Sequence, residues 1–220
     1  MKLYRFPGRS GGSGGARKLF VGGLHGDEGL YTAPILETLA SEVEAEVGDN
    51  YGDLIIVPSL TMGGRYIGVL SEEYYRSREG MILTGLIKRY KPSFYFELHA
   101  YGESSYHRLT NPEREKREGV PPFVDLDDHE HTHNRILLGS IAPVLRELFS
   151  AGDFCLTIEL PKWRSNEEGV REEVMLILRI GLLSETKREM LTQLRKMYPD
   201  ALKRAESLFI QYYHSRLEPF

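Results

Sequence analysis

Short apolar runs alternate along this chain with longer segments in which apolar residues recur every three or four positions. Runs of this length predict buried strands, and they lie at 19–21, 54–58, 94–99 and 154–161. The periodic segments predict helices over 30–47, 79–90, 134–150, 167–182 and 185–198, with a last helix that Pro199 begins. Strands that alternate with helices predict an α/β fold built on a mainly parallel sheet.

No internal repeat and no linker-like change of composition divides the 220 residues. A chain of this length buries roughly 70% of its unfolded surface when it folds as one domain. We therefore expect a single domain over 1–220, with a lead-in at 1–18 and C-terminal helices over 184–220.

The composition excludes several classes of protein. A net charge of -4 and a pI near 6.0 disfavour a nucleic-acid-binding domain, which is usually basic. The single cysteine, Cys155, excludes an internal disulfide framework and favours a reducing compartment. The first residues lack the apolar run of a secretory signal, and no run approaches the ~18 apolar residues of a membrane helix. We expect a soluble cytoplasmic protein that binds neither nucleic acid nor membrane.

Residues suited to metal binding stand at the ends of the predicted strands. His25 and Glu28 follow the first strand, three positions apart on the turn that opens a helix, and His99 ends the strand 94–99. Ligands of open α/β sheets bind beyond the carboxyl ends of the strands. Two histidines and one glutamate form the ligand set of a catalytic zinc that keeps an open fourth position. The sequence therefore favours one zinc ion over three separate structural residues.

Glu159 is a lone carboxylate within the apolar strand 154–161. An unpaired buried carboxylate costs several kcal/mol, so this side chain needs a partner or a role. It either forms an ion pair with an arginine such as Arg76 or acts as the general base that takes a proton from zinc-bound water. The zinc ligands nearby favour the second interpretation.

Three further features leave alternatives open. Glu97 either orients a zinc ligand or is a solvated residue at the edge of its strand, and the sequence favours the second. The acidic, histidine-rich segment 125–133 either binds a second metal or complements the dipole of the helix after it, which is the commoner arrangement. The long polar segment 100–122 is a candidate active-site loop, in which His107 is a candidate substrate contact.

Three motifs resemble those of a known clan. Residues 22–28, Gly-Gly-Leu-His-Gly-Asp-Glu, resemble the Gly-Gly-x-His-Gly-x-Glu signature of zinc carboxypeptidases of the carboxypeptidase A type. They are most similar to the succinylglutamate desuccinylase and aspartoacylase branch. Glu97-Leu98-His99 resembles that branch's Asp-Leu-His, and Thr157-Ile158-Glu159 resembles the strand that carries its catalytic glutamate. The motifs occur in family order over 20–162, and the whole chain also resembles an uncharacterised archaeal family of this clan.

The resemblance implies a three-layer α/β/α fold with a mixed sheet and one zinc ion, held by His25, Glu28 and His99. It also implies hydrolysis of an amide bond next to a carboxylate, with Glu159 as general base. The substrate would be a small molecule or peptide with a free carboxylate. The alternative is a catalytically idle relative that serves as a binding or assembly module.

The chain departs from the family pattern where the substrate carboxylate is bound. Family enzymes use an Asn-Arg pair between the first two motifs, whereas Tyr75 precedes Arg76 here and Arg65 is a second candidate. We expect Arg76, together with zinc, to stabilise the oxyanion as well. The chain is short for the clan, so its specificity loops are either reduced or supplied by a partner subunit, which leaves a homo-oligomer open.

Overall fold

The computed structural model describes residues 1–8, 15–46, 51–61, 63–127, 134–214 and 220. Within these residues, seven strands form one mixed sheet in the order β1-β3-β2-β4-β7-β6-β5. The four central strands β3, β2, β4 and β7 run parallel, while β1 at one edge and the β5–β6 pair at the other are antiparallel. The strands are β1 (Tyr4–Phe6), β2 (Arg17–Gly22), β3 (Asp53–Val57), β4 (Phe94–Tyr101), β5 (Val124–Asp125), β6 (Leu137–Gly139) and β7 (Phe154–Pro161).

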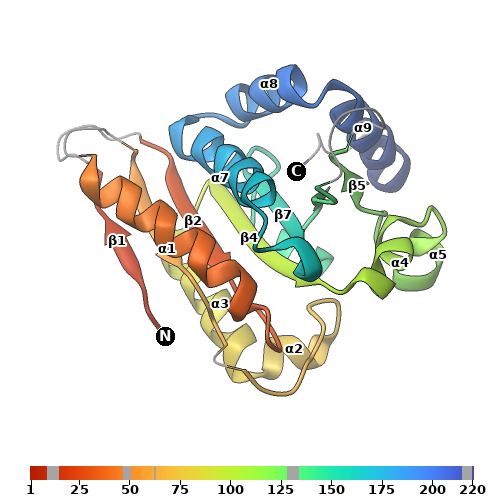
Figure 1. The fold of residues 1–220 in the computed structure, drawn as a ribbon, viewed down its shortest axis with the longest axis horizontal. Coiled ribbons are helices and arrows are strands. Elements are labelled where there is room, and N and C mark those ends of the chain that lie inside the picture. The colour runs from red at the N-terminus through yellow and green to blue at the C-terminus, as the bar shows by residue number, and fades with distance from the viewer. Residues whose placement is uncertain (9–14, 47–50, 62, 128–133, 215–219) are drawn as a thin grey trace.

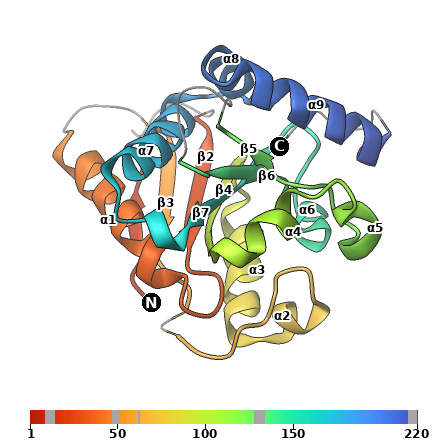
Figure 2. The same cartoon turned by 45° about the vertical axis from the view of Figure 1, so that its right-hand side comes forward.

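Helices cover both faces of the sheet and make the fold three-layered, as the family resemblance implies (Figure 1). On the first face α1 and α7 pack against the sheet, and on the second α3 and α6 do so. Figure 2 shows α4, α5 and α6 on the side of the molecule where β5 and β6 lie. The helices are α1 (Gly29–Ala45), α2 (Glu72–Arg76), α3 (Arg78–Tyr90), α4 (Tyr106–Thr110), α5 (Arg114–Glu118), α6 (Pro143–Arg146), α7 (Glu168–Leu183), α8 (Lys187–Met197) and α9 (Pro199–Tyr213).

Strand β4 separates two kinds of side chain onto the two faces of the sheet. All eight of its residues are buried, so no exposed positions mark its alternation. Phe94, Phe96 and Leu98 belong to the larger core, where the Phe96 ring lies 4.6 Å from that of Phe20. The intervening positions carry Tyr95, Glu97, His99 and Tyr101 on the opposite face. This strand therefore presents a row of hydrogen-bonding side chains on the face that α3 and α6 cover.

The predicted helix over 134–150 is wrong. The three-residue strand β6 and the four-residue α6 lie within this range, and no long helix forms there. Leu137 and Leu138 are buried because β6 pairs with β7, and a Cβ at Gly139 would overlap the Phe123 ring. Pro143 then begins α6, a favoured first position. Strand β1 was also not predicted, and it extends the sheet beside β3.

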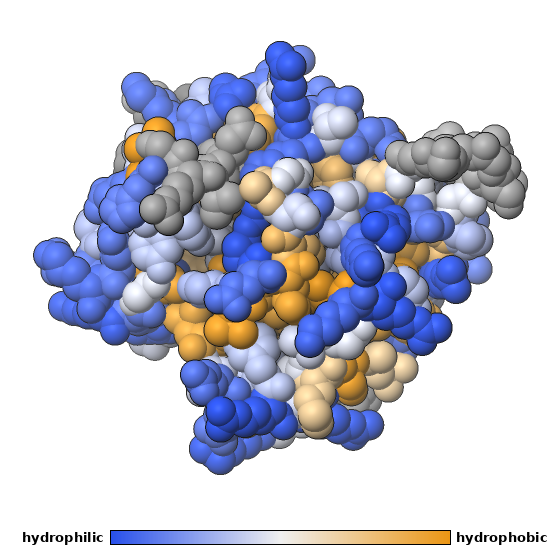
Figure 3. Space-filling model, turned by 180° about the vertical axis from the view of Figure 1, so that it is seen from behind, coloured by the Kyte–Doolittle hydropathy of each residue, from blue (hydrophilic) through white to orange (hydrophobic). Residues whose placement is uncertain are grey.

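The second face retains apolar surface between its helices. Seen from behind, apolar side chains gather near the middle of the molecule, with hydrophilic ones around them (Figure 3). The exposed apolar residues of α3 and α6 include Met81 and Val144. Among the helices described, none combines the length and hydropathy needed to span a bilayer.

Lys18 is an unusual buried cation at the start of β2. Its side chain is 1% exposed, its ammonium donates a hydrogen bond to the carbonyl of Leu182, and it lies 5.6 Å from the centre of the Phe94 ring. Burial lowers the pKa of Lys18 from 10.5 to about 8, against the opposing effect of Glu185 and Glu189. The fold therefore disfavours the protonated form of Lys18, and keeping this charge buried lowers the free energy of unfolding.

The lowered pKa of Lys18 predicts that the free energy of unfolding depends on pH. Between pH 8 and 10.5 the unfolded chain binds more protons at Lys18 than the folded one, so the free energy of unfolding rises with pH. The wild type should gain up to about 3 kcal/mol over this window relative to Lys18→Met, which lacks the titrating group. Urea unfolding of both proteins at pH 7, 8, 9 and 10 measures the difference. A constant difference across these values would show that Lys18 keeps an ordinary pKa.

Candidate metal centre

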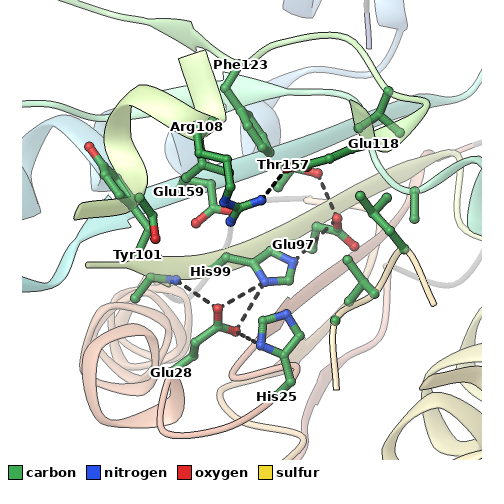
Figure 4. A pocket seen from close by; sticks show the side chains of 18 of the residues that line it. His25, Glu28, Glu97, His99, Tyr101, Arg108, Glu118, Phe123, Thr157 and Glu159 are labelled. Atoms are coloured by element: carbon green, nitrogen blue, oxygen red, sulfur yellow. Dashed lines mark hydrogen bonds and ion pairs between the residues drawn. The ribbon is translucent and has the colours of Figure 1, made fainter. Parts of the chain in front are cut away.

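The turn from β2 into α1 presents the first two candidate ligands. Gly23 has a φ of +55°, and a Cβ at this position would overlap the Ser59 hydroxyl, so the turn requires glycine. The backbone N–H of Glu28 then donates to the carbonyl of His25 at 3.4 Å as the chain enters α1. Both side chains are buried and point toward the end of β4 (Figure 4).

His25 and His99 both lie beside the carboxylate of Glu28. His25 Nδ1 lies 3.3 Å from Glu28 Oε2, and His99 Nδ1 lies 3.1 Å from the same oxygen. The backbone N–H of Ala100 donates to the other oxygen, Oε1, at 3.3 Å. One ligand atom from each of the three residues lies within 4.8 Å of the others.

The chemistry of this group fits zinc. His25 Nδ1 is buried and makes no hydrogen bond among the described residues, although it faces the carboxylate of Glu28. An orphaned buried nitrogen is costly unless a ligand satisfies it. Two imidazole nitrogens and one carboxylate are the donor types that zinc prefers, and three protein ligands leave a coordination position open.

Glu97 supports His99 from behind. The Thr157 hydroxyl donates to Glu97 Oε1 at 2.7 Å, and the Tyr95 hydroxyl donates to Oε2 at 2.9 Å. His99 Nε2 lies 3.5 Å from Oε1, so the imidazole has one carboxylate on each side. Burial opposes a charge on His99, but Glu28 and Glu97 together outweigh burial and raise its pKa well above the usual range. The same two carboxylates favour a cation at this point.

The interpretation of Glu97 as a solvated edge residue is wrong, because its side chain is 1% exposed. β4 lies in the interior of the sheet between β2 and β7, so no position on it is an edge. The signal that could have shown this is the alternation of Tyr95, Glu97, His99 and Tyr101, which sets four hydrogen-bonding side chains on one face.

Glu159 stands beside His99 on the next strand. In the parallel pairing of β4 with β7, His99 is opposite Glu159 and Glu97 is opposite Thr157. These four side chains therefore share one face of two neighbouring strands. Burial raises the pKa of Glu159 to about 7, while His99 acts in the opposite direction. Arg76 does not pair with Glu159, since its guanidinium contacts Glu72 instead.

A cavity of about 490 Å³ opens in front of these residues. His25, Glu28, His99 and Glu159 all line it. Much of the remaining wall comes from the segment 100–122, which folds into a short 3₁₀ helix (Glu103–Ser105), α4 and α5. The residues of this segment that line the cavity are Ala100, Tyr101, Gly102, Ser105, Arg108, Leu109, Arg114, Glu118, Val120 and Pro121.

The structure does not bring the predicted substrate-binding residues to this cavity. The Arg76 side chain is 80% exposed and pairs with Glu72 at 3.0 Å, one helical turn away on α2. Arg65 is 79% exposed and lies 3.4 Å from Glu73. His107 is exposed on α4, with its ring against Tyr106.

Arg108 and Arg114 line the cavity instead, and sequence reasoning missed both. The polar character of 100–122 drew attention to the segment that lines the cavity, but it did not indicate which arginine of that segment faces inward. The spacing of Arg114 and Glu118 is the one available signal, since residues four apart on a helix form ion pairs.

The segment 125–133 is described only in part. Asp127 accepts hydrogen bonds from the backbone N–H groups of Asn134 and Arg135, at 3.0 and 3.2 Å. His129, His131 and His133 lie outside the described residues. The proposed second metal therefore stays untested.

Comparison with known proteins assigns the family. The model of a family described as an uncharacterized protein conserved in archaea (DUF2119) matches residues 13–214. The chain belongs to this archaeal family. A relative, an uncharacterized protein of Methanocaldococcus jannaschii, is 42% identical over 207 residues, which cover 94% of this chain and 93% of the relative. The resemblance to an uncharacterised archaeal family is thereby confirmed.

Two solved structures are similar to this member of the archaeal family. One is a metallo-carboxypeptidase from Pseudomonas aeruginosa in complex with (2-guanidinoethylmercapto)succinic acid, at 15% identity and a TM-score of 0.45, over 89% of this chain and 61% of that one. The other is an aspartoacylase family protein from Mesorhizobium loti, at 15% identity and a TM-score of 0.45, over 84% of this chain and 62% of that one. The chain thus spans about three fifths of the length of either structure.

Proposed function

We propose that this protein is a zinc-dependent hydrolase that cleaves an amide bond next to a carboxylate. One observation carries the proposal: His25, Glu28 and His99 converge at one point, and Glu159 faces the same cavity from the adjacent strand. The motif resemblance to carboxypeptidases and aspartoacylases supports the reaction type. The substrate is a small molecule or a peptide, and the single buried Cys155 supports a cytoplasmic setting.

The chain's own residues divide the work of such a reaction. His25, Glu28 and His99 would hold zinc, which supplies a Lewis acid and an acidified water when bound. Glu159 takes the proton from the attacking water at its carboxylate and delivers it to the nitrogen of the leaving amine. Because Glu159 is not one of the three converging residues, its carboxylate is free for this transfer.

Glu97 orients the imidazole of His99 in the proposed metal site. With Thr157 and Tyr95 as its donors, the Glu97 carboxylate stays beside His99 Nε2, so that His99 Nδ1 faces Glu28. Carboxylates behind a ligating histidine fix its tautomer and ring orientation. The network supports binding at Nδ1 of His99.

Metal analysis and metal removal test the proposal together. Protein purified without added zinc should contain about one zinc ion per chain by elemental analysis, as expected for a site with three protein ligands. It should hydrolyse members of a panel of N-acyl amino acids and short peptides. A chelator should abolish the hydrolysis, and added zinc should restore it. Protein that takes up no metal even from added zinc would exclude the proposed enzyme.

A further inference from the structure

Two arginines from consecutive short helices stand in the cavity wall and share one carboxylate. Arg108 Nη1 on α4 donates to Glu118 Oε1 at 2.6 Å, and Arg114 Nε on α5 donates to Glu118 Oε2 at 2.9 Å. All three side chains line the cavity. The trio carries one positive charge in excess, in a cavity whose other wall holds carboxylates.

The guanidinium of Arg114 makes contacts that stabilise the fold. It is buried, its Nη1 donates to the carbonyl of Pro121 at 3.1 Å, and its guanidinium lies 4.5 Å from the centre of the Phe123 ring. Both contacts hold α5 against the segment 121–123 that leads into β5. The role of Arg114 is therefore structural: it stabilises this part of the cavity wall.

Most of the N–H donors of the Arg108 guanidinium have no partner among the described residues. Its side chain is 53% exposed, and Glu118 is its only hydrogen-bonding partner among the described residues, through Nη1 alone. The other N–H groups of the guanidinium remain available to a ligand. Figure 4 shows the side chain pointing toward the middle of the pocket. A guanidinium fork matches the two oxygens of a carboxylate.

Lys162 is the remaining cation of the cavity wall among the described residues, apart from the histidines. Its ammonium pairs with Asp27 Oδ1 at 2.5 Å and lies 5.3 Å from the centre of the Tyr31 ring. Lys162 thereby connects the end of β7 to the turn before α1. Arg108 is thus the cation best placed for a bound anion.

We propose that Arg108 binds the carboxylate of the substrate, a role that the family pattern would give to Arg76. Glu118 is a positioning residue, since it holds the Nη1 edge and leaves the rest of the fork facing the cavity. Leu109, Val120 and Phe123 line the same space and suit an apolar group. The substrate class is therefore a compound with one carboxylate and an apolar part, a statement that rests on the proposed function for the bond that is cleaved.

Binding of two matched probes tests this assignment without turnover. Phenylacetate and phenethyl alcohol share an apolar ring, and only the first carries a carboxylate. Calorimetry on the zinc-loaded wild type should show that phenylacetate binds ten- to hundredfold more tightly, the range expected for hydrogen bonds between charged groups. Arg108→Gln should remove this preference and leave the affinity for phenethyl alcohol unchanged. Arg117→Gln is the matched control, because Arg117 lies on α5, is exposed and is absent from the cavity wall.

Two conservative variants separate recognition from folding. Arg108→Lys keeps the charge without the fork and should restore part of the preference. Glu118→Gln should reduce the ratio of the two affinities while the alcohol still binds as before, which a general loss of structure would not produce.

The outcomes distinguish this inference from the proposed function. A preference that persists in Arg108→Gln, or is absent from the wild type, would overturn the assignment of Arg108 even if the protein hydrolyses amides. A preference that depends on Arg108 supports the assignment even if no amide is cleaved, and the hydrolase proposal would then fail by itself.

Discussion

Replacing Glu159 with glutamine is expected to leave the zinc content unchanged and to lower kcat/KM for amide hydrolysis by about 10²- to 10⁴-fold, the usual contribution of a general base. Glutamine has nearly the shape of glutamate but cannot accept a proton from water. Glu159 lies opposite His99 in the register of β4 and β7 and is not among the three residues proposed to bind zinc. The metal site should therefore survive the change.

Steady-state kinetics and elemental analysis on the same preparation measure this effect. Glu147→Gln serves as the control, because Glu147 is an exposed carboxylate at the end of α6, away from the cavity. It should behave as the wild type in both measurements. Wild-type kcat/KM in Glu159→Gln would refute the role of this carboxylate as general base.

Replacing His25 with alanine is expected to abolish zinc binding at micromolar zinc. The change removes one of three converging donors, so the loss of affinity should exceed the 10- to 100-fold that removal of a partner behind a ligand typically costs. Zinc per chain after dialysis should fall from about one to near zero. The fold should persist, because His25 lies on the turn after β2 and belongs to none of the apolar clusters.

His107→Ala provides the matched histidine variant. His107 is exposed on α4 and does not line the cavity, so this variant should keep the zinc content of the wild type. Circular dichroism on all three proteins shows whether they are equally folded. Equal zinc in His25→Ala and wild type would place the metal elsewhere in the chain.

Most of the central sheet could be predicted from the sequence for a simple physical reason. Strands β3, β4 and β7 are covered on both faces, so each appears as a mostly apolar run. Polar segments separate one run from the next. β6 and α6 are three and four residues long, too short for any period to appear. Their apolar residues merged into one apparent helix, and only the pairing of β6 with β7 shows the division.

The candidate site was predictable to the extent that its residues follow strands. His25 and Glu28 follow β2 and His99 lies near the carboxyl end of β4, where the topology brings side chains together, and the apolar neighbours of Glu159 made it conspicuous. The position of an arginine along the chain gave no such guidance. Arg76 occupies a comparable place in the motif order but projects from α2 beside Glu72, whereas Arg108 on α4 lines the cavity.

The pairing of β4 with β7 also restricts how this site can vary. Side chains alternate between the faces of a sheet, so one residue inserted into β7 before Glu159 would turn its carboxylate away from His99 and toward α7. Changes in length are tolerable only beyond the strand ends, in segments such as 100–122. The segment proposed to select the substrate is thus free to change in size, while the strands that carry the proposed metal ligand and general base are not.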